Sequence, residues 1–185
     1  MTKLFLDLSK NATRQYLYQE VLNKLSAQDR AQVEQMVLDL PIPNKHHHNV
    51  ASIYNTIDSL PVSDQVKNDA RSIYDILAHA EAEVHGCSIE QTHFHEVGNA
   101  EAIQNTLGIC VAIEAIHPKK ITATCVQTGK GTINCAHGVL DIPAPATSAI
   151  LKRGIPLCEE KIAGELCTPT SAAIIAHFVD EFSSL

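Results

Sequence analysis

Apolar residues recur along this chain with different spacings, and the spacing predicts the kind of element. The run Leu4–Leu8 is apolar apart from Asp7 and predicts a buried strand. The β-branched segments 121–126 and 132–133 predict further strands, with Gly129 and Gly131 between them as turn residues. A short edge strand is predicted over 155–158.

Apolar positions three and four apart predict helices elsewhere. The clearest covers residues 63–84, with Ser63 as its N-cap and Gly86 as its C-terminal stop. A second segment, 99–116, is apolar on most faces and predicts a deeply buried helix. The remaining predicted helices cover residues 12–25, 28–39, 50–57, 143–152 and 168–182.

These elements predict an α/β fold in which a small β-sheet packs with several α-helices. The chain has 185 residues, of which 45% are hydrophobic, enough for one core. We therefore expect a single domain over 1–185, within which the helical stretch 12–84 is a candidate subdomain.

Composition excludes several function classes. The net charge of -7 and the absence of a basic run argue against nucleic-acid binding. No apolar stretch reaches the roughly 18 residues of a membrane span, and the start, with Asp7 in its apolar run, does not resemble a secretory signal. The six cysteines form no CxxC pair, which favours reduced thiols and a cytoplasmic location. Oligomeric state is left open, a homo-oligomer included.

Two histidine clusters are candidates for metal binding. In His93-Phe94-His95-Glu96, histidines two apart point to the same side of an extended segment, with a carboxylate close behind. The alternative is a pair of surface or capping histidines. The tri-histidine segment, His46, His47 and His48, is either a site of loose metal capture, since imidazole suits Ni, Cu and Zn, or a solvated loop after a proline-rich break.

Weaker candidates accompany these clusters. Glu81 and His85 lie four apart on one predicted helix, a spacing that brings ligands together but also simply stabilises helices. Cys135 and His137 have CxH spacing, which a packed cysteine beside a structural histidine also explains. Thr168 and Thr170 begin a predicted helix, so they could hold a phosphate at the free N–H groups or cap the helix.

Several strings occur in one order along the chain: AEAEVHG at 80–86, HFHEVG at 93–98, HGVL at 137–140, PAPAT at 143–147, and GEL with TPT at 164–170. This order resembles the LarC family, the nickel-insertion proteins for the pincer cofactor of lactate racemase. The resemblance implies nickel insertion into pyridinium-3,5-bisthiocarboxylic acid mononucleotide.

The resemblance also implies a set of roles and partners. His93, His95 and Glu96 would form the metal or substrate site, with His85 and His137 nearby. Nickel would be bound by His46 to His48, His85, His93 and His95, and the mononucleotide precursor by Thr168, Thr170 and His137. CTP is consumed with the help of Mn²⁺ or Mg²⁺. The family's CTP-binding carboxy-terminal domain is expected to be absent here, either because a separate partner chain supplies it or because this chain is a truncated piece.

Departures from the family pattern leave a second function open. The family's SGISGDM loop has lost its glycines, and Gln15 stands where the family has aspartate. Glu101 and Asn105 replace two further aspartates. Neutral amides do not supply the negative charge that a hard divalent cation prefers. The alternative to a working insertase module is therefore a non-catalytic relative that binds nickel or partners, and the third option is an unrelated protein with buried histidines.

Overall fold

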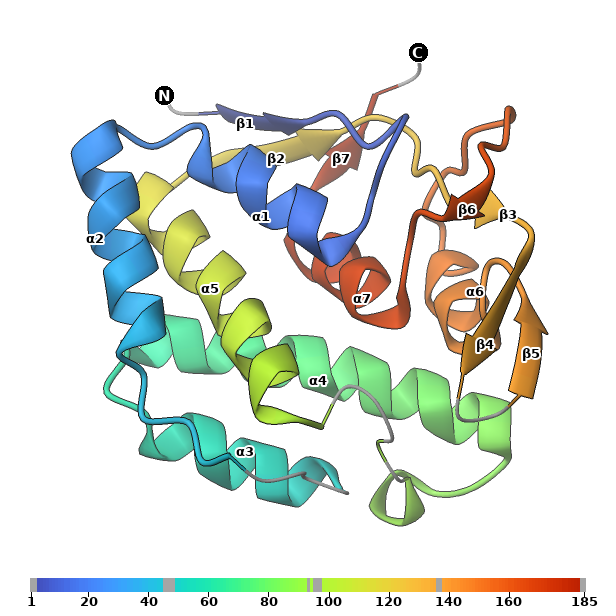
Figure 1. The fold of residues 1–185 in the computed structure, drawn as a ribbon, viewed down its shortest axis with the longest axis horizontal. Coiled ribbons are helices and arrows are strands. Elements are labelled where there is room, and N and C mark those ends of the chain that lie inside the picture. Colours follow the sequence, from blue (N-terminus) through green and yellow to red (C-terminus); the bar gives the residue numbers. More distant parts are fainter. Residues whose placement is uncertain (1–2, 45–48, 93, 95–97, 136–137, 184–185) are drawn as a thin grey trace.

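The computed structural model describes residues 3–44, 49–92, 94, 98–135 and 138–183. A three-stranded parallel sheet runs along one edge of the molecule in the order β1-β2-β7 (Figure 1). Its strands are β1 (Lys3–Leu6), β2 (Lys120–Ala123) and β7 (Glu181–Phe182). In β1 the side chains of Leu4 and Leu6 face the core, while Phe5 between them is 47% exposed, as the period of two predicts.

The described residues form seven α-helices around the core, so the predicted α/β fold is confirmed. They are α1 (Arg14–Leu22), α2 (Ala27–Leu38), α3 (Val50–Ser59), α4 (Asp64–His85), α5 (Ala100–Ile116), α6 (Pro145–Leu151) and α7 (Pro169–Phe178), and a short 3-10 turn, η1 (Ile89–Gln91), follows α4. The limits of α4 are the predicted ones: Ser63 accepts a hydrogen bond from the Val66 N–H, and Gly86 is left-handed.

Two antiparallel pairs complete the fold. β4 (Thr132–Cys135) pairs with β5 (Gly138–Asp141) as a hairpin, and β3 (Gly129–Lys130) pairs with β6 (Gly164–Glu165). Gly129 is required at its position, because it has φ +82° and an added Cβ would lie 1.8 Å from the Gly164 carbonyl oxygen. The β3–β6 pair leads the chain directly into the start of α7.

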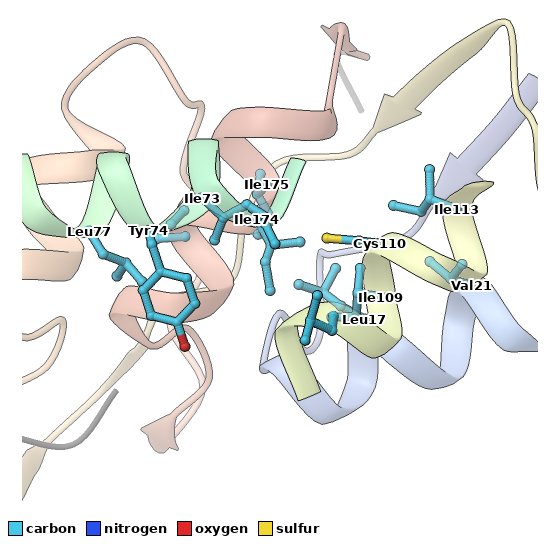
Figure 2. Close-up of a cluster of buried hydrophobic side chains, with 14 of the residues drawn as sticks. Leu17, Val21, Ile73, Tyr74, Leu77, Ile109, Cys110, Ile113, Ile174 and Ile175 are labelled. Atoms are coloured by element: carbon cyan, nitrogen blue, oxygen red, sulfur yellow. The ribbon is translucent and has the colours of Figure 1, made fainter. Parts of the chain in front are cut away.

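Four helices that are distant in sequence meet in the core, as Figure 2 shows. The buried side chains come from α1, α4, α5 and α7, and include Leu17, Val21, Ile73, Tyr74, Leu77, Ile109, Cys110, Ile113, Ile174 and Ile175. Because α4 also packs against α3 and α6, it is the common partner of most other helices. This packing fixes where the C-terminal end of α4 lies relative to the starts of α6 and α7.

Two predicted elements near the carboxy-terminal end are wrong. The last helix ends at Phe178 instead of Phe182, because Glu181 and Phe182 pair with β2. The Asp180 N–H donates to the Ile121 carbonyl at 2.9 Å and continues this pairing. The predicted edge strand 155–158 is reduced to one isolated bridge between Val126 and Leu157.

The expectation that all six cysteines are reduced is also wrong for one pair. Cys125 and Cys158, 33 residues apart, form a disulfide. Hydrogen bonds bring them together: the Val126 N–H donates to the Pro156 carbonyl, and the Cys158 N–H to the Val126 carbonyl. Since this contact is tertiary, cysteine spacing in the sequence does not reveal it.

No helix within the described ranges has the length and apolar character needed to cross a membrane.

Candidate functional site

A cavity of about 530 Å³ opens where the starts of α1, α6 and α7 meet the end of α4. This volume lies within the range usual for small-molecule sites. Figure 1 shows that α1 comes from the amino-terminal part of the sequence, α4 from its middle, and α6 and α7 from its carboxy-terminal part. The residues that line the cavity are Thr13, Arg14, Gln15, Glu81, Val84, His85, Phe94, Ala102, Ile133, Cys135, Leu140, Ala144, Pro145, Ala146, Glu165, Thr168, Pro169 and Thr170.

Glu81 and His85 contribute an acid and an imidazole from the last turns of α4. His85 Nε2 lies 3.5 Å from Glu81 Oε2, and both side chains line the cavity. The helical spacing therefore brings these two together as expected. The neighbouring His79 lies elsewhere and contacts Asp75, with Nδ1 2.8 Å from the Asp75 carbonyl oxygen.

The two threonines of the TPT string differ in what they do. Thr168 caps α7: its hydroxyl accepts from the Ser171 N–H at 3.3 Å, and the Ser171 hydroxyl accepts from the Thr168 N–H. Thr170 is only 4% exposed and lines the cavity. Within the described part of the chain, neither its hydroxyl nor its N–H has a hydrogen-bond partner.

Arg14 and Gln15 line the cavity at the first turn of α1. The helix begins here because the Thr13 hydroxyl accepts from the Tyr16 N–H at 3.3 Å. The Ala12 N–H donates to the Leu166 carbonyl at 2.8 Å, which ties the entry of α1 to the segment preceding α7. Arg14 is not among the site residues predicted from the sequence, although a cation one residue after a helix N-cap can be recognised in the sequence.

Phe94 is buried, and its side chain forms part of the cavity wall. Its ring packs edge-on against Tyr74, with 6.2 Å between ring centroids. Burial raises the pKa of the Tyr74 phenol above its usual value, so this group stays neutral near pH 7. The aromatic pair holds Phe94 at the cavity wall.

Cys135, at the end of β4, places a thiol on the cavity wall, where its Sγ contacts the Gly138 carbonyl oxygen at 3.5 Å. A thiolate is a soft metal ligand. Among the described residues, no three His, Cys, Asp or Glu side chains gather closely enough to hold a metal ion.

Most of the predicted histidine ligands are not tested by the structure. The residues His46, His47, His48, His93, His95, Glu96 and His137 lie outside the described ranges. Phe94 and Cys135, their described neighbours in sequence, both line the cavity. Gln15, Glu101 and Asn105 are the positions at which the resemblance implies aspartate; Gln15 lines the cavity, while Glu101 and Asn105 on α5 are not among its lining residues.

Comparison with known proteins gives one consistent result. A family described as nickel insertion protein matches residues 6–185. The chain is 39% identical over 162 residues to the pyridinium-3,5-bisthiocarboxylic acid mononucleotide nickel insertion protein of Staphylococcus epidermidis, covering 86% of this chain and 41% of that relative. The protein of the same name from Staphylococcus saprophyticus is 43% identical over 144 residues, which cover 77% of this chain and 37% of the relative.

A third relative of that name, from Clostridium kluyveri, is 42% identical over 132 residues, covering 71% of this chain and 33% of its own length. The chain thus matches less than half the length of these curated relatives. No solved structure matches the chain.

Proposed function

The chain belongs to the nickel insertion protein family, and we propose that its cavity is where nickel is inserted into a pyridinium-3,5-bisthiocarboxylic acid mononucleotide. One observation carries this proposal. Every string of the resemblance contributes a described residue to the cavity: Glu81 and His85, Phe94, Leu140, Ala144 to Ala146, Glu165, and Thr168 to Thr170. Strings that are separated by up to about ninety residues therefore converge on one place.

Nickel is a substrate in this reaction, and its ligands must first hold it and then release it to the mononucleotide. We assign delivery to His93, His95 and Glu96, with His85 and His137 nearby, because imidazole suits Ni²⁺. The proposed role of His46, His47 and His48 is loose capture of nickel before delivery. Cys135 adds a thiol to the cavity wall, and the nickel–sulfur bonds of the product would lie next to this wall.

CTP with Mn²⁺ or Mg²⁺, and a carboxy-terminal partner, are the further reactants that we propose. The curated relatives are more than twice the length of the matched region, which leaves ample sequence for such a domain. In this arrangement the described cavity binds nickel and the mononucleotide.

The test uses the full 185-residue chain with Ni²⁺, the mononucleotide, CTP and Mn²⁺, and the carboxy-terminal half of one of these relatives is added as the proposed partner. After removal of free metal, bound nickel is quantified and the nickel-containing mononucleotide is sought by mass spectrometry. We expect nickel and mononucleotide to be retained together. The His93→Ala, His95→Ala double variant should retain about tenfold less nickel, the scale on which metal-site substitutions act.

The matched control is His79→Ala, since His79 lies on α4 outside the cavity lining. Absence of retained nickel in the unaltered chain, with and without mononucleotide, would contradict the proposed function. Equal retention by the double variant would contradict only the assignment of His93 and His95.

A second candidate function is binding of nickel or a partner without insertion. Gln15 favours it, because this neutral amide lines the cavity at the position where the family has aspartate. Retention of nickel and mononucleotide without any nickel-containing product, followed by product formation in Gln15→Asp, would support this alternative.

A further inference from the structure

The cavity contains hydrogen-bond donors that the protein itself leaves unused. Arg14 is half-buried, lines the cavity, and has no ion-pair or hydrogen-bond partner among the residues that the structure describes. Thr170 is more than nine-tenths buried, and neither its hydroxyl nor its N–H has a partner among the described residues. Both residues line the cavity, so their donors are available to a ligand bound there.

These donors lie at the joined starts of two helices. The hydrogen bond from the Ala12 N–H to the Leu166 carbonyl, 2.8 Å long, holds the entries to α1 and α7 side by side. In α7, Pro169 has no N–H and Thr168 caps the N–H of Ser171, so Thr170 presents the remaining free N–H of the first turn. Both helix dipoles favour negative charge at this point.

Arg14 and Gln15 are adjacent on the cavity wall, one a cation and the other a neutral amide. This pair suits an anion and does not supply the negative charge that a hard cation prefers at this position.

We propose that Arg14 and Thr170 together bind a phosphomonoester, which, resting on the proposed function, is the phosphate of the mononucleotide substrate. The guanidinium donates two parallel hydrogen bonds to phosphate oxygens, and the hydroxyl and N–H of Thr170 donate to the remaining ones. The ligand class is a pyridinium mononucleotide in preference to the corresponding riboside.

Two carboxylates, Glu81 and Glu165, line the same cavity, and they determine how such a ligand is oriented. A phosphate is repelled by them and attracted by Arg14, whereas a cationic pyridinium ring is attracted by them. Glu81 is also held next to His85, at 3.5 Å. Glu81 lies on α4, whereas Glu165 precedes α7, so Glu81 is the carboxylate that orients the ring toward α4 while the phosphate lies at the starts of α1 and α7.

The test measures binding of nicotinic acid mononucleotide and of its dephosphorylated riboside to the full chain by calorimetry. We expect the mononucleotide to bind at least about tenfold tighter than the riboside, because charge-assisted hydrogen bonds to one phosphate contribute a difference in affinity of this size. Arg14→Ala should remove most of this preference, Arg14→Lys should keep part of it, and Thr170→Val should weaken mononucleotide binding about fivefold.

Arg30→Ala is the matched control, because it makes the same change in net charge on α2, where Arg30 pairs with Glu34. The conservative variants Arg14→Lys and Thr170→Val keep the test valid if Arg14→Ala fails to fold. Equal affinity for mononucleotide and riboside, or mononucleotide affinity unchanged in both Arg14 variants, would overturn the proposal.

The outcome is separable from that of the proposed function. If nickel is inserted while the Arg14 variants keep full mononucleotide affinity, the phosphate assignment fails and the function stands. If the mononucleotide binds through Arg14 while no nickel is retained, the phosphomonoester site stands and the function fails.

Discussion

Two hollows in this molecule differ in whether their polar groups are already satisfied. The larger, of about 870 Å³, lies around the Cys125–Cys158 disulfide. Its buried amide, Gln127, is 1% exposed and bonded at both ends: the Gly129 N–H donates to Oε1 at 3.0 Å, and Nε2 donates to the Glu160 carbonyl at 2.8 Å. The smaller hollow is the candidate site, where Thr170 lacks such partners among the described residues.

The difference shows that volume alone does not identify a binding site. In the larger hollow, hydrogen bonds and a covalent bond hold the wall together, so its residues should contribute mainly to stability. In the smaller, donors remain available to a ligand, so its residues should contribute mainly to binding. Substitutions in the two hollows should therefore separate these effects.

The largest effect on stability is expected from removing the disulfide. For cysteines 33 residues apart, the chain-entropy model predicts that Cys125→Ser with Cys158→Ser lowers the free energy of unfolding by ~3–4 kcal/mol. Urea denaturation of the oxidised chain and the double variant measures this loss. Mononucleotide affinity in native conditions should stay the same, because neither cysteine lines the smaller cavity.

Cys87→Ser is the control, since Cys87 is a free, half-buried thiol whose contact with Thr92 is long, 3.9 Å. If the double-serine variant is as stable as this control, the disulfide does not stabilise the wall of the larger hollow.

A smaller loss is expected from Gln127→Leu, which keeps the side-chain size but leaves the buried N–H of Gly129 without its acceptor. The free energy of unfolding should fall by about 2–3 kcal/mol. Thermal or urea denaturation measures it, and mononucleotide affinity is measured in parallel. Gln32→Leu on the exposed face of α2 should change stability by less than about 0.5 kcal/mol. If Gln127→Leu weakened mononucleotide binding while stability held, the comparison of the two hollows would be reversed.

The smallest effect on stability is expected from replacing His46, His47 and His48 together by alanine. The sequence predicts a solvated loop for this segment, and surface substitutions usually change stability by less than about 0.5 kcal/mol. The variant should bind fewer loosely held nickel ions by equilibrium dialysis, yet keep the mononucleotide affinity of the unaltered chain. Loss of all nickel retention in this variant would instead make the tri-histidine segment the principal nickel site.

Much of the fold was predictable because helices depend on residues close in sequence. The apolar spacing of α4, its Ser63 cap and its Gly86 stop act within a few residues, and all three are confirmed. The order of the strings from AEAEVHG to TPT likewise indicated the family that the comparisons show. The roles of His93, His95 and the other histidines remain predictions.

Other features depend on contacts between distant parts of the chain, and only the tertiary structure decided them. Phe182 leaves the last helix because β2, about sixty residues earlier, offers it backbone partners. Cys125 meets Cys158 through bonds between their neighbours. Thr168 and Thr170 look alike in the sequence, and both line the cavity. Thr168 caps α7, whereas the hydroxyl and N–H of Thr170 have no partner among the described residues.

Arg14 is the clearest case of this division between sequence and structure. The sequence determines that a cation follows the Thr13 cap at the start of a helix. Only the packing of α1 and α7 through the Ala12–Leu166 hydrogen bond places that cation at the cavity beside Thr170. The physical reason is that helix starts are fixed by local hydrogen bonds, whereas a binding cavity exists only where several elements pack around the same space.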